Sequence, residues 1–371
     1  MSLPPLKPME AVSALFSTEK PEVSIAVFNS LSQAIFEENE TRPAGTFKRL
    51  LSRLSHRLLK RTTTATQGED AHGNESTVFR NALLERSDHA YAKSLLGSLK
   101  AENASLVEGG DPMNAQYMMI PPAIRKNGEL WDRLYFDSVQ GRDVQLRFIL
   151  ETRATYEWAK RLLEAGSPVR MKAVAAGTGL SMILTYDKLI AAGYPSELIT
   201  ALITDRDSAN IEKGRRLLSN LPSTKDRPLC MVEGCGISAE SEDIFGSTHE
   251  GDAIVPQPYD IVTAIGIFEY FQGVTLTTTE QRHGQPTPQD IYSAIDLAHR
   301  LKSMTAADGH LIVNTYRDDP SARILEIFGR KFDYRSRAHL STLLSHADFH
   351  PSELIGSGHV YDVEVFKHGA S

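Results

Sequence analysis

The sequence has little cysteine, and its cysteines are not arranged as a metal site or a disulfide framework. Its 371 residues include 2 cysteines, Cys230 and Cys235. Four residues separate them, and no nearby cysteine or histidine pair completes a set of zinc ligands. We therefore expect two reduced thiols, no metal site and a cytoplasmic location.

Long apolar runs and an excess of positive charge are also missing. No segment approaches the roughly 20 apolar residues of a membrane helix, and the first residues lack the apolar core of a signal peptide. The 40 Lys and Arg side chains are outnumbered by 47 Asp and Glu, which gives a formal net charge of −7. Because broad nucleic-acid binding favours a basic face, we expect a small-molecule substrate and neither a nucleic-acid nor a membrane partner. A homodimer is possible.

The most informative stretch is an apolar run followed by a glycine turn and a helical pattern. Ala173–Ala176 has the length of a buried strand, Gly177 and Gly179 form the turn, and the helical pattern begins at Leu180. This order presents backbone N–H groups and a helix N-terminus to a ligand. Without Cβ atoms, the two glycines would let the ligand approach the backbone, although ordinary strand–helix junctions use the same turn.

Further apolar runs follow, separated by helical patterns. The strand-like runs are Leu198–Thr204, Leu229–Val232, Tyr259–Gly266 and Gly309–Tyr316, and the helical patterns are Ser181–Ala192, Ala209–Ser219 and Pro288–Met304. Alternation of buried-type strands with helices predicts a parallel sheet covered on both faces.

Charged residues follow two of these runs. Asp205 and Arg206 end the second strand, and Glu233 and Gly234 end the third. An acidic residue at the tip of the second strand is placed to hold the ribose hydroxyls of a bound nucleoside. A carboxylate suits this task because it accepts hydrogen bonds and presents no donor of its own.

In this order and spacing, the motifs resemble those of class I S-adenosylmethionine-dependent methyltransferases. The resemblance rests on Ala173–Ser181, Asp205, Glu233-Gly234, Tyr259–Gly266 and Ala307–Val313, and it covers roughly the C-terminal half of the chain. It implies that residues 167–371 form an α/β domain with a doubly wound, mostly parallel sheet of seven strands, the last of them antiparallel. The strand-like segments Ser352–Ile355 and Val360–Phe366, after a helical Arg335–Ser345, fit this pattern.

The resemblance also implies a cofactor, S-adenosyl-L-methionine, and a set of residues beside it. The residues implied at the cofactor are Arg142, Ala176, Gly177, Gly179, Asp205, Arg206, Glu233, Gly234, Ile265 and Gly266. The fourth and fifth strands deliver Glu269, Tyr270, Asn314 and Tyr316 towards the substrate. Displacement at a sulfonium carbon mainly needs alignment and a site that excludes water, which tyrosines and apolar walls provide.

Two positions depart from the family pattern. Ala175 stands where an acidic residue usually orients the methionine part of the cofactor, and Ser181 replaces the third glycine. We expect methyl transfer to a small metabolite, since the Asn-Pro-Pro-Tyr-like pattern of nucleic-acid and protein amide methylation is absent after the fourth strand. The departures keep a second chemistry open, namely aminocarboxypropyl transfer or cyclisation to azetidine-2-carboxylate with release of methylthioadenosine.

Two other classes are weaker alternatives, and a third has no support. A nicotinamide-dependent dehydrogenase is disfavoured because the glycine turn lacks its third glycine, and a non-catalytic binding protein could retain the same fold. Hydrolase chemistry has no support, because no Gly-x-Ser-x-Gly elbow is present.

Residues 1–108 have the periodicity of a mainly α-helical N-terminal domain. Helical spacing occurs at Glu22–Asn39, Thr46–Lys60 and Val78–Leu106, whereas Thr62–Ser76 has almost no large apolar residue and predicts a surface loop. Thr46–Lys60 is a basic amphipathic helix that could touch an acidic surface or a membrane. We favour the alternative, in which its basic face is solvated above a helical core.

Residues 109–166 are predicted to form a lid and linking helices. Gly109–Asn127 is irregular yet apolar, so it either covers the cofactor, with Tyr117 in the site wall, or is a connecting loop. Asp143–Leu163 reads as a long helix. Just before it, Arg142 could grip the cofactor carboxylate and Tyr135 could stabilise the sulfonium through its ring face. The alternatives are a surface arginine and a core tyrosine.

Overall fold

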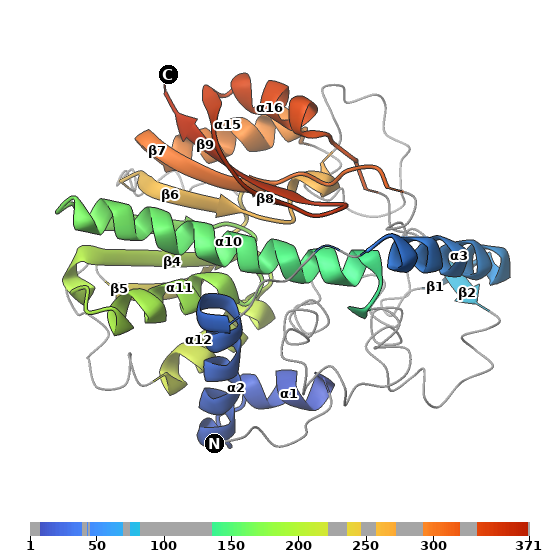
Figure 1. The fold of residues 1–371 in the computed structure, drawn as a ribbon, viewed down its shortest axis with the longest axis horizontal. Helices are drawn as coiled ribbons and strands as arrows, with labels where there is room; N and C mark the ends of the chain where they lie inside the picture. Colours follow the sequence, from blue (N-terminus) through green and yellow to red (C-terminus); the bar gives the residue numbers. More distant parts are fainter. Residues whose placement is uncertain are drawn as a thin grey trace.

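The computed structural model describes residues 8–38, 43, 45–69, 75–81, 136–221, 236–245, 257–271, 292–319 and 332–369 (Figure 1). Its helices are α1 (Pro8–Leu15), α2 (Pro21–Gln33), the π-helix η1 (Ala34–Glu38), α3 (Thr46–Thr62), α10 (Val139–Glu164), α11 (Leu180–Ala191), η2 (Ser196–Leu198), α12 (Ser208–Asn220), η3 (Phe268–Tyr270), α15 (Ala294–Met304) and α16 (Arg337–Ser345). Its strands are β1 (Thr63–Glu69), β2 (Glu75–Asn81), β3 (Val169–Ala173), β4 (Ile199–Asp205), β5 (Gly236–Ser241), β6 (Tyr259–Ala264), β7 (Thr305–Asn314), β8 (Phe349–Ser357) and β9 (Asp362–His368).

The larger sheet confirms the predicted fold class. Seven strands lie in the order β5-β4-β3-β6-β7-β9-β8. Strands β3 to β7 pair in parallel, and β9 is antiparallel to both of its neighbours, β7 and β8. Strand order reverses between β3 and β6, and in open α/β sheets ligands bind outside the carboxyl ends of the strands at such a point.

Alternate strand residues face two different apolar cores. Ile261 and Ile312 belong to a core shared with α10, α11 and α12, whereas Val262 and Val313 belong to a core shared with α15 and α16. Figure 1 shows α15 and α16 beside β7 and β9, and α11 and α12 beside β4 and β5. The sheet is therefore buried on both faces, and each fully buried large apolar side chain contributes about 1.5–3 kcal/mol.

Side-chain caps fix where several helices begin. The Ser138 hydroxyl accepts from Gly141 N at 3.1 Å at the start of α10, and Asp207 Oδ1 accepts from Ala209 N at 2.8 Å at the start of α12. Ser293 and Asp296 form a reciprocal capping box at α15. Such caps satisfy N–H groups that have no partner within the helix, so the helix starts are fixed by local sequence.

Two strand predictions need correction. The first strand is Val169–Ala173 rather than Ala173–Ala176, because Val169, Met171 and Ala173 alternate into one core and the chain turns after Ala173. Leu229–Val232 lies outside the described residues, and the strand paired with β4 is Gly236–Ser241. The carboxyl end of this strand is at Ser241, and Glu233 and Gly234 lie outside the described residues.

The N-terminal helices α1 and α2 pack on the sheet domain instead of enclosing a core of their own. Leu15, Val27, Phe28 and Leu31 share one apolar core with α10, α11 and α12. Asn220 Nδ2 donates to the Ser17 carbonyl at 3.1 Å. Helices α1 and α2 are thus attached to the helical layer on one face of the sheet.

Two N-terminal predictions were wrong. Most of the expected loop Thr62–Ser76 and the start of the expected helix Val78–Leu106 instead form the antiparallel hairpin of β1 and β2. Runs of β-branched threonine favour a strand, which explains the hairpin. Helix α3 is amphipathic as predicted, but its apolar side is exposed, with Phe47 76% and Leu50 55% accessible.

Across the part of the chain that the structure describes, no helix is both long and apolar enough to span a bilayer. The longest described helix, α10, carries many buried polar groups. These groups give α10 its importance for the site at the sheet edge.

Candidate functional site

The glycine turn after β3 lies against the carboxylate at the tip of β4. Gly177 N donates to Asp205 Oδ2 at 2.7 Å, and Asp207 N donates to Oδ1 at 2.9 Å. Burial raises the pKa of Asp205, and the hydrogen bonds from Asp207 and Gly177 oppose the shift. The structure therefore brings together two of the predicted cofactor residues, and Ala176 and Arg206 flank them half-buried.

The two glycines of this turn are needed for different reasons. Both are left-handed, with φ 58° at Gly177 and 70° at Gly179. A Cβ on Gly177 would meet nothing within 4 Å, whereas a Cβ on Gly179 would lie within 2.8 Å of three Ile203 side-chain carbons. Gly177 leaves open space for a ligand. At position 179, the close packing of α11 on β4 is enough to explain why the residue is glycine.

This half of the sheet edge fits a nucleoside cofactor. The Asp205 carboxylate also accepts a hydrogen bond from the Asn210 side chain, and its two oxygens have about four lone-pair sites, so acceptor capacity is left for a ligand. The open position at Gly177 lets a ligand reach the backbone. Ala175, at φ 50°, is exposed and presents no acid there. Gly177 and Asp205 are therefore in place at the nucleoside end of the predicted site. At the methionine end, residue 175 supplies no acidic group.

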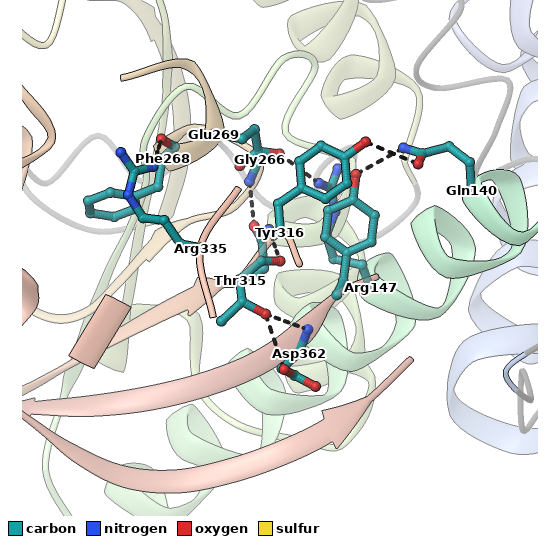
Figure 2. A network of polar contacts seen from close by, with 11 residues as sticks. Gln140, Arg147, Gly266, Phe268, Glu269, Thr315, Tyr316, Arg335 and Asp362 are labelled. Atoms are coloured by element: carbon teal, nitrogen blue, oxygen red, sulfur yellow. Dashed lines mark hydrogen bonds and ion pairs between the residues drawn. The ribbon is translucent and has the colours of Figure 1, made fainter. Parts of the chain in front are cut away.

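The turn after β6 contains a buried ion pair that the sequence did not predict (Figure 2). Arg147 Nη1 of α10 lies 3.3 Å from Glu269 Oε1, and each side chain is 4% exposed. The Arg147 guanidinium also lies over the Tyr361 ring, 4.6 Å from its centre. Gly266 has φ 74°, and a Cβ there would be 3.2 Å from the Arg147 nitrogens, so glycine gives the arginine its room.

Glu269 is the buried acid of this region. Burial raises its pKa, and the neighbouring Arg147 charge is the main opposing influence. Its second oxygen, Oε2, has no hydrogen-bond partner among the described residues. A buried acceptor without a partner is costly, which makes this oxygen a candidate for contact with a ligand.

Asn314 ties the end of β7 to the turn after β6. Its Oδ1 accepts from Gly266 N at 2.6 Å, and its Nδ2 donates to the Thr315 carbonyl at 3.0 Å. Asn314 is buried, and the neighbouring Ile265 is half-buried. The predicted residues Ile265, Gly266, Glu269 and Asn314 are therefore brought together.

Arg335 fixes the short helix that carries Glu269. Its Nη1 donates to the Phe268 carbonyl at 2.6 Å, its Nη2 donates to the Phe271 carbonyl, and its backbone N donates to Tyr316 O at 2.8 Å. Figure 2 shows its side chain reaching the Phe268 carbonyl. These contacts hold η3 against the end of β7, and no sequence motif marked this arginine.

Tyr316 lies in the wall of this region, with its hydroxyl already bonded. The hydroxyl donates to Gln140 Oε1 at 3.1 Å, and Gln140 Nε2 donates to the Tyr361 hydroxyl at 3.1 Å. The Tyr316 and Tyr361 rings stack with centres 4.8 Å apart. Burial raises the pKa of Tyr316 well above its ordinary value, so a phenolate is disfavoured and the side chain acts as a rigid wall.

Two other predicted residues have different surroundings. The Tyr270 ring is half-buried and 5.5 Å from the Phe332 ring. Arg142 Nη1 lies 3.8 Å from Asp137 Oδ1. The α10 arginine that contacts Glu269 at the sheet edge is Arg147. Tyr117, Tyr135, Glu233 and Gly234 lie outside the described residues, so their predicted roles stay predictions.

A buried acid on α10, Glu151, contacts the start of α11. Ser181 Oγ donates to Glu151 Oε1 at 2.7 Å. Burial raises the pKa of Glu151 to about 7, and the Ser181 hydrogen bond opposes the shift. Ser181, which replaces the third glycine, is thus the partner of an acid. Charged residues at positions 147 and 151, one helical turn apart, were the missed signal.

Among the described residues, no group of three or more His, Cys, Asp or Glu side chains could hold a metal ion.

The chain was compared with protein-family models, curated proteins and solved structures. No protein-family model and no curated protein matches the chain. Among solved structures, a magnesium protoporphyrin IX methyltransferase from Synechocystis with bound SAH is 12% identical over 61% of this chain and 87% of its own, with a TM-score of 0.37.

Two other solved structures are similar over most of the chain. The CMeT domain of a citrinin polyketide synthase is 14% identical over 96% of this chain and 89% of its own, with a TM-score of 0.42. A possible exported protein from Bordetella parapertussis is 12% identical over 95% of this chain and 99% of its own, with a TM-score of 0.44. The strand order is what carries the conclusion: the chain has the fold of the class I methyltransferases that its motifs resemble.

Proposed function

We propose that the chain is an S-adenosylmethionine-dependent enzyme that transfers a methyl group to a small-molecule substrate. One observation carries the proposal: a single sheet edge combines the Gly177–Asp205 pair with the buried acid Glu269. The cofactor would supply an electrophilic methyl carbon. The chain's own residues would bind it, orient the acceptor and exclude water.

The β3–β4 half of the edge would hold the nucleoside. Asp205 would accept hydrogen bonds from the ribose hydroxyls, and the open side of Gly177 would allow close approach. Ile265 and Gly266 would line the site from β6. Arg206 and Arg142 would lie beside the cofactor, as the sequence predicts, although Arg142 forms an ion pair with Asp137 in the described structure.

The β6–β7 half would receive the acceptor. The Glu269 carboxylate, paired with Arg147, would take through Oε2 the proton that a hydroxyl or amine nucleophile loses as it becomes methylated, and would thereby become the neutral acid. Asn314 and Tyr316 would position this wall, and Tyr270, Tyr117 and Tyr135 are proposed to complete the enclosure. A dry, aligned site suits methyl displacement, which needs little other help.

Mass spectrometry of the nucleoside product tests the proposal. The protein is incubated with S-adenosylmethionine alone and with a panel of small hydroxyl and amine acceptors. Acceptor-dependent formation of S-adenosylhomocysteine and a methylated acceptor is expected. Methylthioadenosine would instead indicate aminocarboxypropyl transfer or cyclisation and would contradict methyl transfer.

A matched pair of variants tests the role of Glu269. Glu269→Gln should abolish most turnover, whereas Glu353→Gln removes a surface carboxylate, 40% exposed, and should not. Equal turnover of the two variants would remove Glu269 from the proton-accepting role.

A further inference from the structure

Helix α3 is oriented with its polar side inward and its apolar side outward. The outward stripe consists of large apolar side chains that are 48–76% exposed: Phe47 76%, Leu50 55%, Leu51 48%, Leu54 51% and Leu58 55%. They recur at intervals of three and four residues and therefore share one face of the helix. The more covered positions include Lys48, Arg49, Ser52 and His56, and near the end of the helix Leu59, which is buried in the main apolar core.

Ion pairs hold the helix in this orientation. Lys48 Nζ lies 3.3 Å from Asp137 Oδ1, just before α10, and Arg49 Nη2 lies 3.1 Å from Asp319 Oδ2, after β7. Arg53 Nη2 adds a second contact to Asp319, at 3.7 Å. One acid precedes α10 and the other follows β7, and their charges direct the basic side of α3 inward and leave the apolar stripe outside.

The charge of α3 is of one sign throughout. The helix contains no acidic residue, and Arg57, Lys60 and Arg61 are exposed near its C-terminal end. This is a local feature, because the whole chain has a formal net charge of −7. Figure 1 shows α3 extending from the start of α10 at one end of the described structure.

We propose that α3 docks on an anionic lipid surface, lying in the interface with its apolar stripe in the acyl boundary. Exposed leucine and phenylalanine on one face, with arginine and lysine beside them, are the properties of interfacial helices. The exposed basic side chains near the end of the helix, Arg57, Lys60 and Arg61, would meet the anionic headgroups, as polybasic segments do. Pairing with α3 of a second copy is disfavoured, because two helices without a single acid would repel each other.

Vesicle flotation tests the proposal with the full chain. Vesicles with about 30% phosphatidylserine should bind the protein at least about tenfold more strongly than pure phosphatidylcholine vesicles, and salt should weaken the binding. Leu51→Ser/Leu54→Ser should lower the partition coefficient about tenfold or more. Its control is Leu198→Ser/Leu354→Ser, which alters two leucines outside α3 that are 36% and 43% exposed.

A second pair of variants tests the charge. Arg57→Gln/Lys60→Gln should weaken binding to the anionic vesicles, and Lys160→Gln/Arg216→Gln, which removes the same charge elsewhere, should leave it unchanged. Absence of vesicle binding, or equal binding by the stripe variant and its control, would overturn the proposal.

Two further outcomes would reassign the stripe. A concentration-dependent dimer in light scattering that the stripe variant dissociates, without vesicle binding, would assign it to a second copy. A thermal midpoint lowered by the stripe variant and not by its control, again without vesicle binding, would show that another part of the chain covers it.

Discussion

The two halves of the sheet's carboxyl edge are assembled over very different distances in the chain. Gly177 and Asp205, at the ends of β3 and β4, are 28 residues apart and meet through a backbone N–H. At β6 and β7, Glu269 meets Arg147 across 122 residues and Tyr316 meets Gln140 across 176. The first half is a local strand–turn–helix feature, whereas the second depends on where α10 lies.

The two halves therefore suit different tasks: the local half suits nucleoside binding, and the long-range half suits selection of the acceptor. The local half presents groups that any nucleoside could use, so the sequence motif suffices to find it. The long-range half combines a buried acid, an arginine and stacked tyrosines, whose arrangement decides which acceptor fits. Specificity should therefore follow changes in α10 and η3 more closely than changes in the glycine turn.

The largest expected effect comes from breaking the ion pair of the long-range half. Arg147→Ala leaves the Glu269 carboxylate buried without its counter-charge and should lower the unfolding free energy by about 3–5 kcal/mol. Arg161→Ala is the control, because its pair with Glu353 also spans 3.3 Å but the side chains are 52% and 40% exposed. That change should cost about 0–1 kcal/mol. Urea unfolding measures both variants, and equal losses of unfolding free energy would contradict the difference between the buried and the exposed ion pair.

The next effect concerns the pH dependence of stability through Glu151. Its pKa is raised from 4.5 to about 7 by burial. The folded state therefore binds more protons than the unfolded state across this window, and stability should fall as pH rises from 4.5 to 7. The upper limit is about 3 kcal/mol, from roughly 1.4 kcal/mol per pKa unit.

Unfolding titrations at pH 5 and pH 7.5 measure this change. Glu151→Gln should remove most of the loss, and Glu353→Gln, at the surface, should leave it in place. An unchanged pH profile in Glu151→Gln would show that other groups cause the dependence.

A smaller effect distinguishes the two glycines of the local half. Gly179→Ala forces a Cβ against Ile203 and should cost about 1–3 kcal/mol for overpacking, in addition to its left-handed backbone. Gly177→Ala meets open space and should cost only the backbone strain, about 1–2 kcal/mol. Thermal unfolding of both variants measures the difference, and equal midpoints would contradict the distinct roles.

The sequence predicted the sheet because its evidence is local. Apolar runs, helical periodicity, the glycine turn and the family resemblance identified β4, β6, β7, α11 and the antiparallel end of the sheet to within a few residues. β3 was misplaced because Arg170 and Lys172 interrupt an otherwise apolar strand. Gly236–Ser241 was not recognised as a strand, since it is less apolar than Leu229–Val232, which lies outside the described residues.

The candidate site was predictable only in part. Gly177, Asp205, Gly266, Glu269 and Asn314 follow strands, so their place at the edge could be deduced. The contributions of Arg147, Glu151 and Gln140 could not, because they depend on which face of α10 meets the sheet. Their signal was present as charged and amide residues inside a helix that is otherwise apolar on its buried side.

Calorimetric titration of S-adenosylmethionine tests the central claim most directly, because it separates cofactor binding from acceptor chemistry. The wild-type chain should bind, Asp205→Ala should lose about 1.5–3 kcal/mol of binding free energy, and Glu269→Gln should bind as the wild type does. Circular dichroism confirms that each variant is folded. Undiminished binding by a folded Asp205→Ala variant, or no binding by the wild type, would contradict the assignment of the nucleoside to the Gly177–Asp205 half.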